Sequence, residues 1–306
     1  MKIGIPRAFL YYKYGAMWTA FFRALGADVV LSKKTTKETL NRGAMLSIDE
    51  TCLSSKVFMG HVESLIGECD RIFVPRIAGF GKDGIMCTKF EALYDLVQNT
   101  FRDRSPRLID FDIDPAKGKS ELSAYMQLGR KLGATRASSF RAYLSAKQSY
   151  AEKRSDIARA MRDKLSGGGI KVLIVGHPYV VYDEYIGGPV IDYMRSLGAT
   201  PVLACEADED LSADKYTEIT DSLPWMMSRQ LVGAVAMYRD MVDGIVLMSA
   251  FPCGPDSLVN EILVRRVHGL PMLTLTMDVQ DGEAGVETRL ESFIDIINMK
   301  REARNG

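Results

Sequence analysis

Short apolar segments typical of buried β-strands alternate with amphipathic helical segments, and this alternation restricts the fold more than any other feature. Strands are predicted at residues 2–6, 27–32, 71–75 and 107–113, and again at 170–175, 199–205, 244–250 and 271–277. Helical segments separate these strands, so successive strands run parallel and helices cover both faces of each sheet. The sequence therefore predicts an α/β protein with two Rossmann-like, doubly wound parallel-sheet lobes.

The segment between the two sets of strands has only the apolar spacing of helices. It ends at Ser166-Gly-Gly-Gly169, a sequence typical of a boundary between structural units. We therefore predict an N-terminal α/β lobe over residues 1–114, a helical connector over 115–168 and a C-terminal α/β lobe over 169–306. A chain of 306 residues is long for one hydrophobic core, which agrees with two lobes.

The charge balance and the cysteine count exclude several classes of protein. Lys plus Arg equals Asp plus Glu at 39 each, so net charge gives no attraction to nucleic acid or to an anionic membrane. No long apolar segment suggests a signal peptide or a membrane span, so we expect a cytoplasmic protein without a nucleic-acid or membrane partner. Five widely spaced cysteines are an odd number, which favours reduced thiols over a disulfide framework.

Three cysteines are predicted in loops or at helix starts. Cys253 follows the strand at 244–250 and precedes a helix, where the positive end of the helix dipole favours a thiolate. Cys52 opens a helix, and Cys87 follows the strand at 71–75. Soft metals and iron-sulfur clusters take such ligands, but the chain has no CxxC pair. The residues alone leave independent thiols, a nucleophile, a zinc ligand and a cluster ligand open.

Other candidate site residues lie near predicted strand ends, where ligands collect in open parallel sheets. We expect Arg76, His177 and Asp256 to line a crevice there, with His177 in a Gly-His-Pro-Tyr loop. No glycine-rich phosphate-binding loop or GxSxG nucleophile motif is present. The sequence therefore assigns no catalytic acid or base.

Seven groups of residues, in order along nearly the whole chain, resemble one known family. They are Ile3-Gly-Ile-Pro-Arg7 with Tyr11-Tyr12, Glu50-Thr-Cys52 with Lys56 and Gly60-His61, Phe73-Val-Pro-Arg76, Cys87-Thr-Lys-Phe90, Gly176-His-Pro-Tyr179 with Tyr182-Asp183, Phe251-Pro-Cys-Gly-Pro-Asp-Ser257, and Glu283-Ala-Gly285 with Thr288-Arg289. The family is that of 2-hydroxyacyl-CoA dehydratases and activase-related proteins of anaerobic bacteria and archaea. The resemblance is to its uncharacterised activase-related branch, here without the ATPase domain to which that branch is also found fused.

The resemblance implies an iron-sulfur protein that accepts low-potential electrons from an ATP-dependent activator (activase). In the family, motif cysteines hold a cluster between α/β lobes. Cys52, Cys87 and Cys253 match motif cysteines, whereas Cys69 and Cys205 match none. The implied cofactor is a [4Fe-4S] cluster, in which three thiolates leave one iron open to another ligand.

Some residues beside these cysteines depart from the family pattern. The family commonly has proline after its first two motif cysteines, where this chain has Leu53 and Thr88, and glycine where Pro252 stands. These departures leave loss of the cluster open, so one alternative is a cluster-free or zinc-bound two-lobe binding protein. Another alternative is a dehydratase-like or reductase enzyme that acts on a CoA thioester or another small molecule at an open cluster iron. A homodimer is one candidate assembly.

Overall fold

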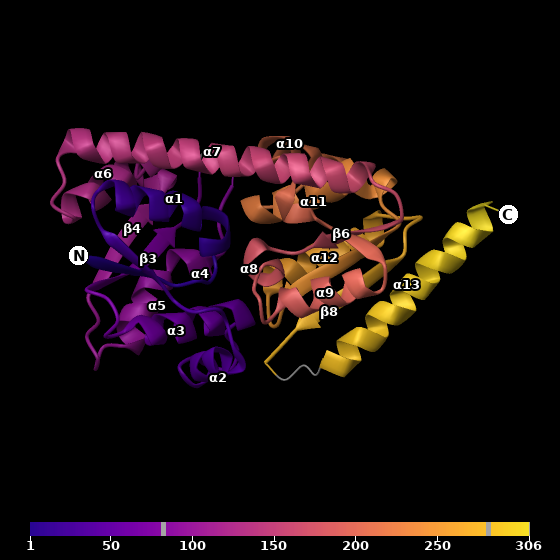
Figure 1. The fold of residues 1–306 in the computed structure, drawn as a ribbon, viewed down its shortest axis with the longest axis horizontal. Coiled ribbons are helices and arrows are strands. Elements are labelled where there is room, and N and C mark those ends of the chain that lie inside the picture. Colours follow the sequence, from indigo (N-terminus) through magenta and orange to yellow (C-terminus); the bar gives the residue numbers. More distant parts are fainter. Residues whose placement is uncertain (81–83, 280–282, 306) are drawn as a thin grey trace. The chain divides into compact units, whose positions relative to one another are not determined.

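The computed structural model describes residues 1–80, 84–279 and 283–305 (Figure 1). It divides the chain into two compact units, Met1–Arg154 and Ser155–Gly306, each with its own parallel sheet. The predicted α/β class with two doubly wound parallel sheets is thereby confirmed. The boundary between the units falls inside α7 (Arg136–Ser166), so the helical segment predicted as a connector is shared between them.

Each sheet has four strands in the same relative order. The first sheet, ordered β2-β1-β3-β4, contains β1 (Lys2–Ile5), β2 (Asp28–Leu31), β3 (Arg71–Ile77) and β4 (Leu108–Ile113). The second, ordered β6-β5-β7-β8, contains β5 (Ile170–Val175), β6 (Ala199–Leu203), β7 (Gly244–Ala250) and β8 (Met272–Met277). All neighbouring strands pair in parallel, so their carboxyl ends share one edge of each sheet.

Helices cover both faces of the first sheet (Figure 1). They are α1 (Tyr11–Ala24), α3 (Leu53–Leu65), α4 (Thr88–Glu91), α5 (Leu93–Thr100) and α6 (Glu121–Lys131), and α2 (Lys37–Met45) packs on α3. On one face, Trp18 and Phe22 of α1 pack edge-on against Phe73 of β3. On the other face, Leu65 of α3 approaches Gly4 of β1. This two-sided burial explains why β1 and β3 are nearly continuous apolar runs.

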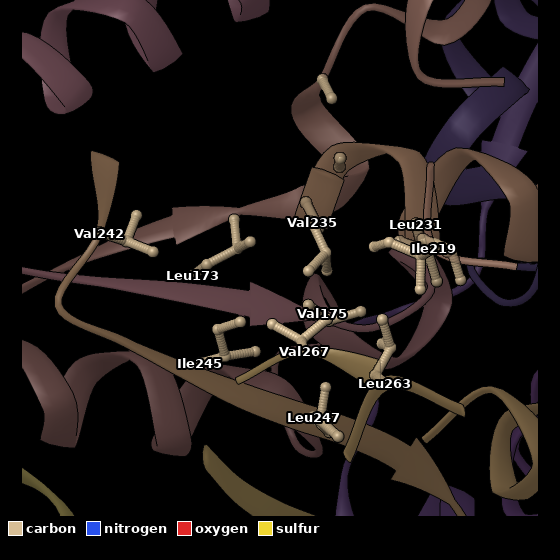
Figure 2. Close-up of a cluster of buried hydrophobic side chains, with 14 of the residues drawn as sticks. Leu173, Val175, Ile219, Leu231, Val235, Val242, Ile245, Leu247, Leu263 and Val267 are labelled. Carbon is tan, nitrogen blue, oxygen red and sulfur yellow. The ribbon is translucent and has the colours of Figure 1, made fainter. Parts of the chain in front are cut away.

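The second sheet is covered in the same way. Its helices are α8 (Pro178–Val181), α9 (Gly187–Ser196), α10 (Glu209–Lys215), α11 (Met226–Tyr238), α12 (Gly254–Arg266) and α13 (Glu283–Asn305). Figure 2 shows the core on one face, where Leu173 and Leu247 of the sheet lie near Val235 and Leu263 of α11 and α12. Burying one such side chain fully stabilises the fold by about 1.5–3 kcal/mol. On the other face, α13 packs against Gly244 of β7.

The strand order gives each sheet one switch point, where the chain leaves two adjacent central strands toward opposite faces. In the first unit this point lies between β1 and β3, and in the second unit between β5 and β7. The loops after these strands therefore diverge and leave space for functional side chains at the edge. Among the described residues, no helix is long and apolar enough to cross a membrane.

Candidate functional site

Cys52, Cys87 and Cys253 each occupy the N-cap position of a helix: α3, α4 and α12, respectively. All three have extended backbone, and each carbonyl accepts an early helical hydrogen bond, from Lys56, Phe90 and Ser257 at 3.1, 2.9 and 3.0 Å. Each cysteine therefore lies beside the backbone amide groups that begin its helix. At α3 and α12, which are each 13 residues long, the helix dipole favours negative charge at this position.

The topology also explains which edge these cysteines occupy. A helix that connects parallel strands runs opposite to them, so it begins near the carboxyl edge of the sheet. Cys52 begins the helix that leads into β3, and Cys87 follows β3. Both thus belong to the carboxyl edge of the first sheet. Cys253 follows β7 and belongs to the corresponding edge of the second sheet.

Phe9 links the two cysteine-capped helices of the first unit. Its ring centroid lies 5.5 Å from that of Phe58 on α3 and 4.9 Å from that of Phe90 on α4. Phe9 follows β1 with a φ of 50°, in the left-handed region that bulky residues rarely adopt. Such a conformation costs about 1–3 kcal/mol and is retained only where the surrounding structure imposes it. The sequence gives no signal for this role of Phe9.

The other two cysteines have packing roles. Cys69 donates a hydrogen bond from its thiol to the Leu65 carbonyl at 3.3 Å, and burial raises the pKa of the Cys69 thiol. A Cβ atom at Gly4 would lie only 2.5 Å from the Cys69 sulfur. Cys205 lies in a short 3₁₀ helix, Ala204–Glu206, and packs against the core of the second unit. All five cysteines lie in the described part of the chain and are thiols rather than disulfides.

Across residues 1–80, 84–279 and 283–305, no three His, Cys, Asp or Glu side chains are grouped as metal ligands. The assignment of Cys52, Cys87 and Cys253 as cluster ligands therefore stays a prediction. What the structure adds is their shared position at helix N-termini, which Cys69 and Cys205 lack.

His177 and Asp256, two of the three predicted crevice residues, contact each other at the switch point of the second unit. The Nε2 atom of His177 lies 2.9 Å from Oδ1 of Asp256, and their side chains are only 5% and 8% exposed. His177 precedes α8 after β5, and Asp256 lies in the first turn of α12 after β7. The His177 Nδ1 and Asp256 Oδ2 atoms are buried and have no hydrogen-bond partner within the described residues. Sequence reasoning proposed both residues but not their pairing.

Two neighbouring residues fix the position of this pair. A Cβ atom at Gly176 would lie 2.8 Å from the Met248 carbonyl oxygen, so glycine allows the end of β5 to approach β7 closely. The Tyr179 ring stacks on the imidazole of His177 with centroids 5.0 Å apart and planes inclined by 21°. The imidazole is therefore held both in its plane and at one nitrogen.

Arg76, the third predicted crevice residue, belongs to the first unit and has a different environment. Its guanidinium donates two hydrogen bonds of 2.8 Å to the Asp95 carboxylate and lies over the Tyr94 ring. The Asp95 side chain is 53% exposed, so this ion pair is largely solvated and contributes little to stability. Within the first unit, Arg76 is therefore occupied by Asp95 and Tyr94.

The motif that contains Cys52 also supplies two buried polar side chains on α3. His61 is fully buried and its Nε2 atom lies 2.9 Å from the Thr35 hydroxyl. Burial, and secondarily the positive charge of Arg7, lowers the pKa of His61 to about 4, so the ring is neutral at pH 7. Lys56 is also buried and donates a hydrogen bond to the Asp49 carbonyl at 3.0 Å.

Comparisons with known proteins bear on the family and not on the ligand. No curated protein matches the sequence. The structure of a FpvC mutant from Pseudomonas aeruginosa aligns with 98% of this chain and 100% of its own, at 14% identity and a TM-score of 0.29. A TM-score this low does not establish a shared fold. The family model of the CoA enzyme activase uncharacterised domain (DUF2229) matches residues 2–206, about two thirds of the chain. The chain therefore belongs to the activase-related family of the CoA enzyme activase uncharacterised domain.

Proposed function

We propose that this protein binds a [4Fe-4S] cluster through Cys52, Cys87 and Cys253 and accepts low-potential electrons from an ATP-dependent activator protein. The observation that carries the proposal is the division of the five thiols into two classes. Three thiols sit at helix N-termini at the carboxyl edges of the sheets, and two are packed against helices or core. The same three match the motif cysteines of the resembling family.

The donor set fits the chemistry of the cofactor. Iron-sulfur clusters are held by thiolates, and the N-termini of α3 and α12 favour negatively charged sulfur. A bound cluster would supply one-electron transfer, with one iron not bound by these three cysteines.

Each of the three cysteines has an apolar neighbour in the sequence. An exposed apolar residue precedes each cysteine by two to four positions: Ile48 before Cys52, Ile85 before Cys87 and Phe251 before Cys253. Apolar surroundings limit solvent access to a metal centre and influence its reduction potential. Apolar residues close to the thiols in the sequence fit this requirement, although each of them is half exposed or more.

The test is anaerobic purification followed by analysis of iron and acid-labile sulfide. We expect about four irons per chain in the wild-type protein and loss of that iron in Cys52→Ala, Cys87→Ala and Cys253→Ala. Cys69→Ala and Cys205→Ala are the matched controls and should retain the cluster. A colourless wild-type protein without iron or sulfide would exclude the cluster, and one zinc per chain would instead support the two-lobe binding protein.

A second measurement addresses the partner. Mixing the iron-loaded protein with an ATP-dependent activator and ATP should produce the EPR signal of a reduced cluster, and omission of ATP should abolish it. No reduction with ATP would contradict the role of electron acceptor.

A second candidate function is an enzyme that acts on a CoA thioester or another small molecule. The buried His177–Asp256 pair favours it, because such pairs can serve as acid–base groups. An EPR signal that changes when acyl-CoA is added to the iron-loaded protein would favour the enzyme over the carrier.

A further inference from the structure

The His177–Asp256 pair offers two hydrogen-bond acceptors that nothing in the described part of the chain satisfies. When Nε2–H of His177 donates to Oδ1 of Asp256, the neutral ring presents Nδ1 as an acceptor. The second carboxylate oxygen, Oδ2, is likewise an acceptor. A buried polar group without a partner costs about 1–3 kcal/mol, so a site with two such atoms needs a reason.

The chemistry of these atoms restricts what could bind. No third His, Cys, Asp or Glu within residues 1–80, 84–279 and 283–305 completes a group of metal ligands with the pair, which disfavours a cation site. The Asp256 carboxylate would repel an anionic group brought against it. The complementary group is therefore a hydrogen-bond donor without negative charge, and a hydroxyl is the simplest such group.

We propose that the second unit binds a small hydroxyl-bearing molecule at the β5/β7 switch point, with its hydroxyl donating to Nδ1 of His177. Asp256 is a positioning residue that holds the ring through Nε2, and Tyr179 fixes the plane of the ring. The site lies where open parallel sheets bind ligands, beside loops that leave β5 and β7 in different directions. The proposal does not depend on a cluster, because neither residue is among the proposed cluster ligands.

The same arrangement suits proton transfer from the bound hydroxyl. The O–H proton passes to Nδ1, the electron pair of the broken bond stays on oxygen, and the Asp256 carboxylate stabilises the imidazolium that forms. No oxidant or second reactant is needed for this step. The pair therefore provides the acid–base group that the sequence did not assign.

The small number of histidines makes a direct test practicable. The chain has three, so long-range ¹H–¹⁵N spectra should resolve His61, His177 and His268, and His177→Gln identifies the signal of His177. We expect an unprotonated Nδ1 on His177 at neutral pH. Ethylene glycol, which donates hydrogen bonds, should shift that signal saturably, whereas 1,2-dimethoxyethane, which donates none, should leave it unchanged.

Two variants separate ligand binding from a purely structural contact. His177→Gln keeps an N–H group able to bond Asp256 but removes the imidazole Nδ1, so it should stay folded and lack the one signal that ethylene glycol shifts in the wild-type protein. Asp256→Ala frees the ring, so the fraction of His177 with a protonated Nδ1 should rise and the response to ethylene glycol should weaken. A protonated Nδ1 in the wild-type protein overturns the proposal. So does a His177 signal that ethylene glycol and 1,2-dimethoxyethane shift equally, or that neither of them shifts. These readouts report hydrogen bonding at His177 and do not measure bound iron, so failure of the cluster hypothesis remains distinguishable.

Discussion

Replacing Gly233 by alanine is expected to destabilise the second unit by about 3 kcal/mol or more, because α11 touches α10 through this residue. A Cβ atom at Gly233 would lie 1.7 Å from the Ser212 carbonyl oxygen and 2.5 Å from its carbonyl carbon. Both obstructing atoms belong to the backbone of α10, so no side-chain rotation can relieve the overlap. The two helices would have to separate, which would disturb the core that contains Val232 and Val235.

Urea unfolding of Gly233→Ala beside Gly285→Ala measures this effect against a matched control. A Cβ atom at Gly285 in α13 meets nothing within 4 Å, so the same substitution should stabilise the protein slightly, by up to about 1 kcal/mol. Similar midpoints for Gly233→Ala and the wild-type protein would show that the α10–α11 contact is not as close as described.

The first unit repeats this close contact between two consecutive helices. A Cβ atom at Gly43 of α2 would lie 1.8 Å from the Lys56 carbonyl oxygen, and one at Gly60 of α3 would lie 2.1 Å from the Thr39 carbonyl oxygen. Both helix pairs join the outer strand beside the switch point to the central strand on its other side. Each unit therefore uses glycine to bring a helix pair together at the same place in its topology.

The pattern of apolar residues was enough to predict the strands of both sheets, because buried parallel strands are continuous apolar runs that can be recognised without knowledge of the tertiary contacts. It did not suffice for α10, whose sequence Glu-Asp-Leu-Ser-Ala-Asp-Lys has little apolar periodicity and depends on the contact with Gly233. The start of α2 is also fixed by hydrogen bonds. Thr36 and Thr39 form a capping box, in which each side chain accepts a hydrogen bond from the backbone N–H of the other residue. Helix ends are set by hydrogen bonds that composition alone does not place.

The candidate site could likewise be predicted only in part from the sequence. The positions of Cys52, Cys87 and Cys253 near helix starts could be predicted, because turn residues and apolar spacing locate strand-to-helix junctions. The contact between His177 and Asp256 could not, because it joins loops after two different strands and depends on strand order. Sequence reasoning can identify such residues as candidates, whereas only the fold brings them together.

Acidification should destabilise the protein through His61 between about pH 6.5 and pH 4. The pKa of His61 is lowered to about 4 by burial and by Arg7, whereas the unfolded chain should titrate near 6.5. Above pH 6.5 both states are neutral and the full stability is present. As the pH falls, the unfolded state takes up the proton first, so the free energy of unfolding decreases until the folded state also binds it near pH 4. The loss expected from this residue is on the order of 3 kcal/mol.

A variant without the titrating group isolates the contribution of His61 from that of the acidic residues. His61→Gln keeps a neutral group that can hydrogen-bond Thr35 but cannot take up a proton in this pH range. Its free energy of unfolding, measured in urea from pH 7.5 to pH 4, should fall less steeply than that of the wild-type protein. All other ionisable groups are the same in both proteins, so the difference between the two curves reports His61. Parallel curves would mean that His61 is protonated as readily in the folded protein as in the unfolded chain, which would contradict the burial of its ring beside Thr35.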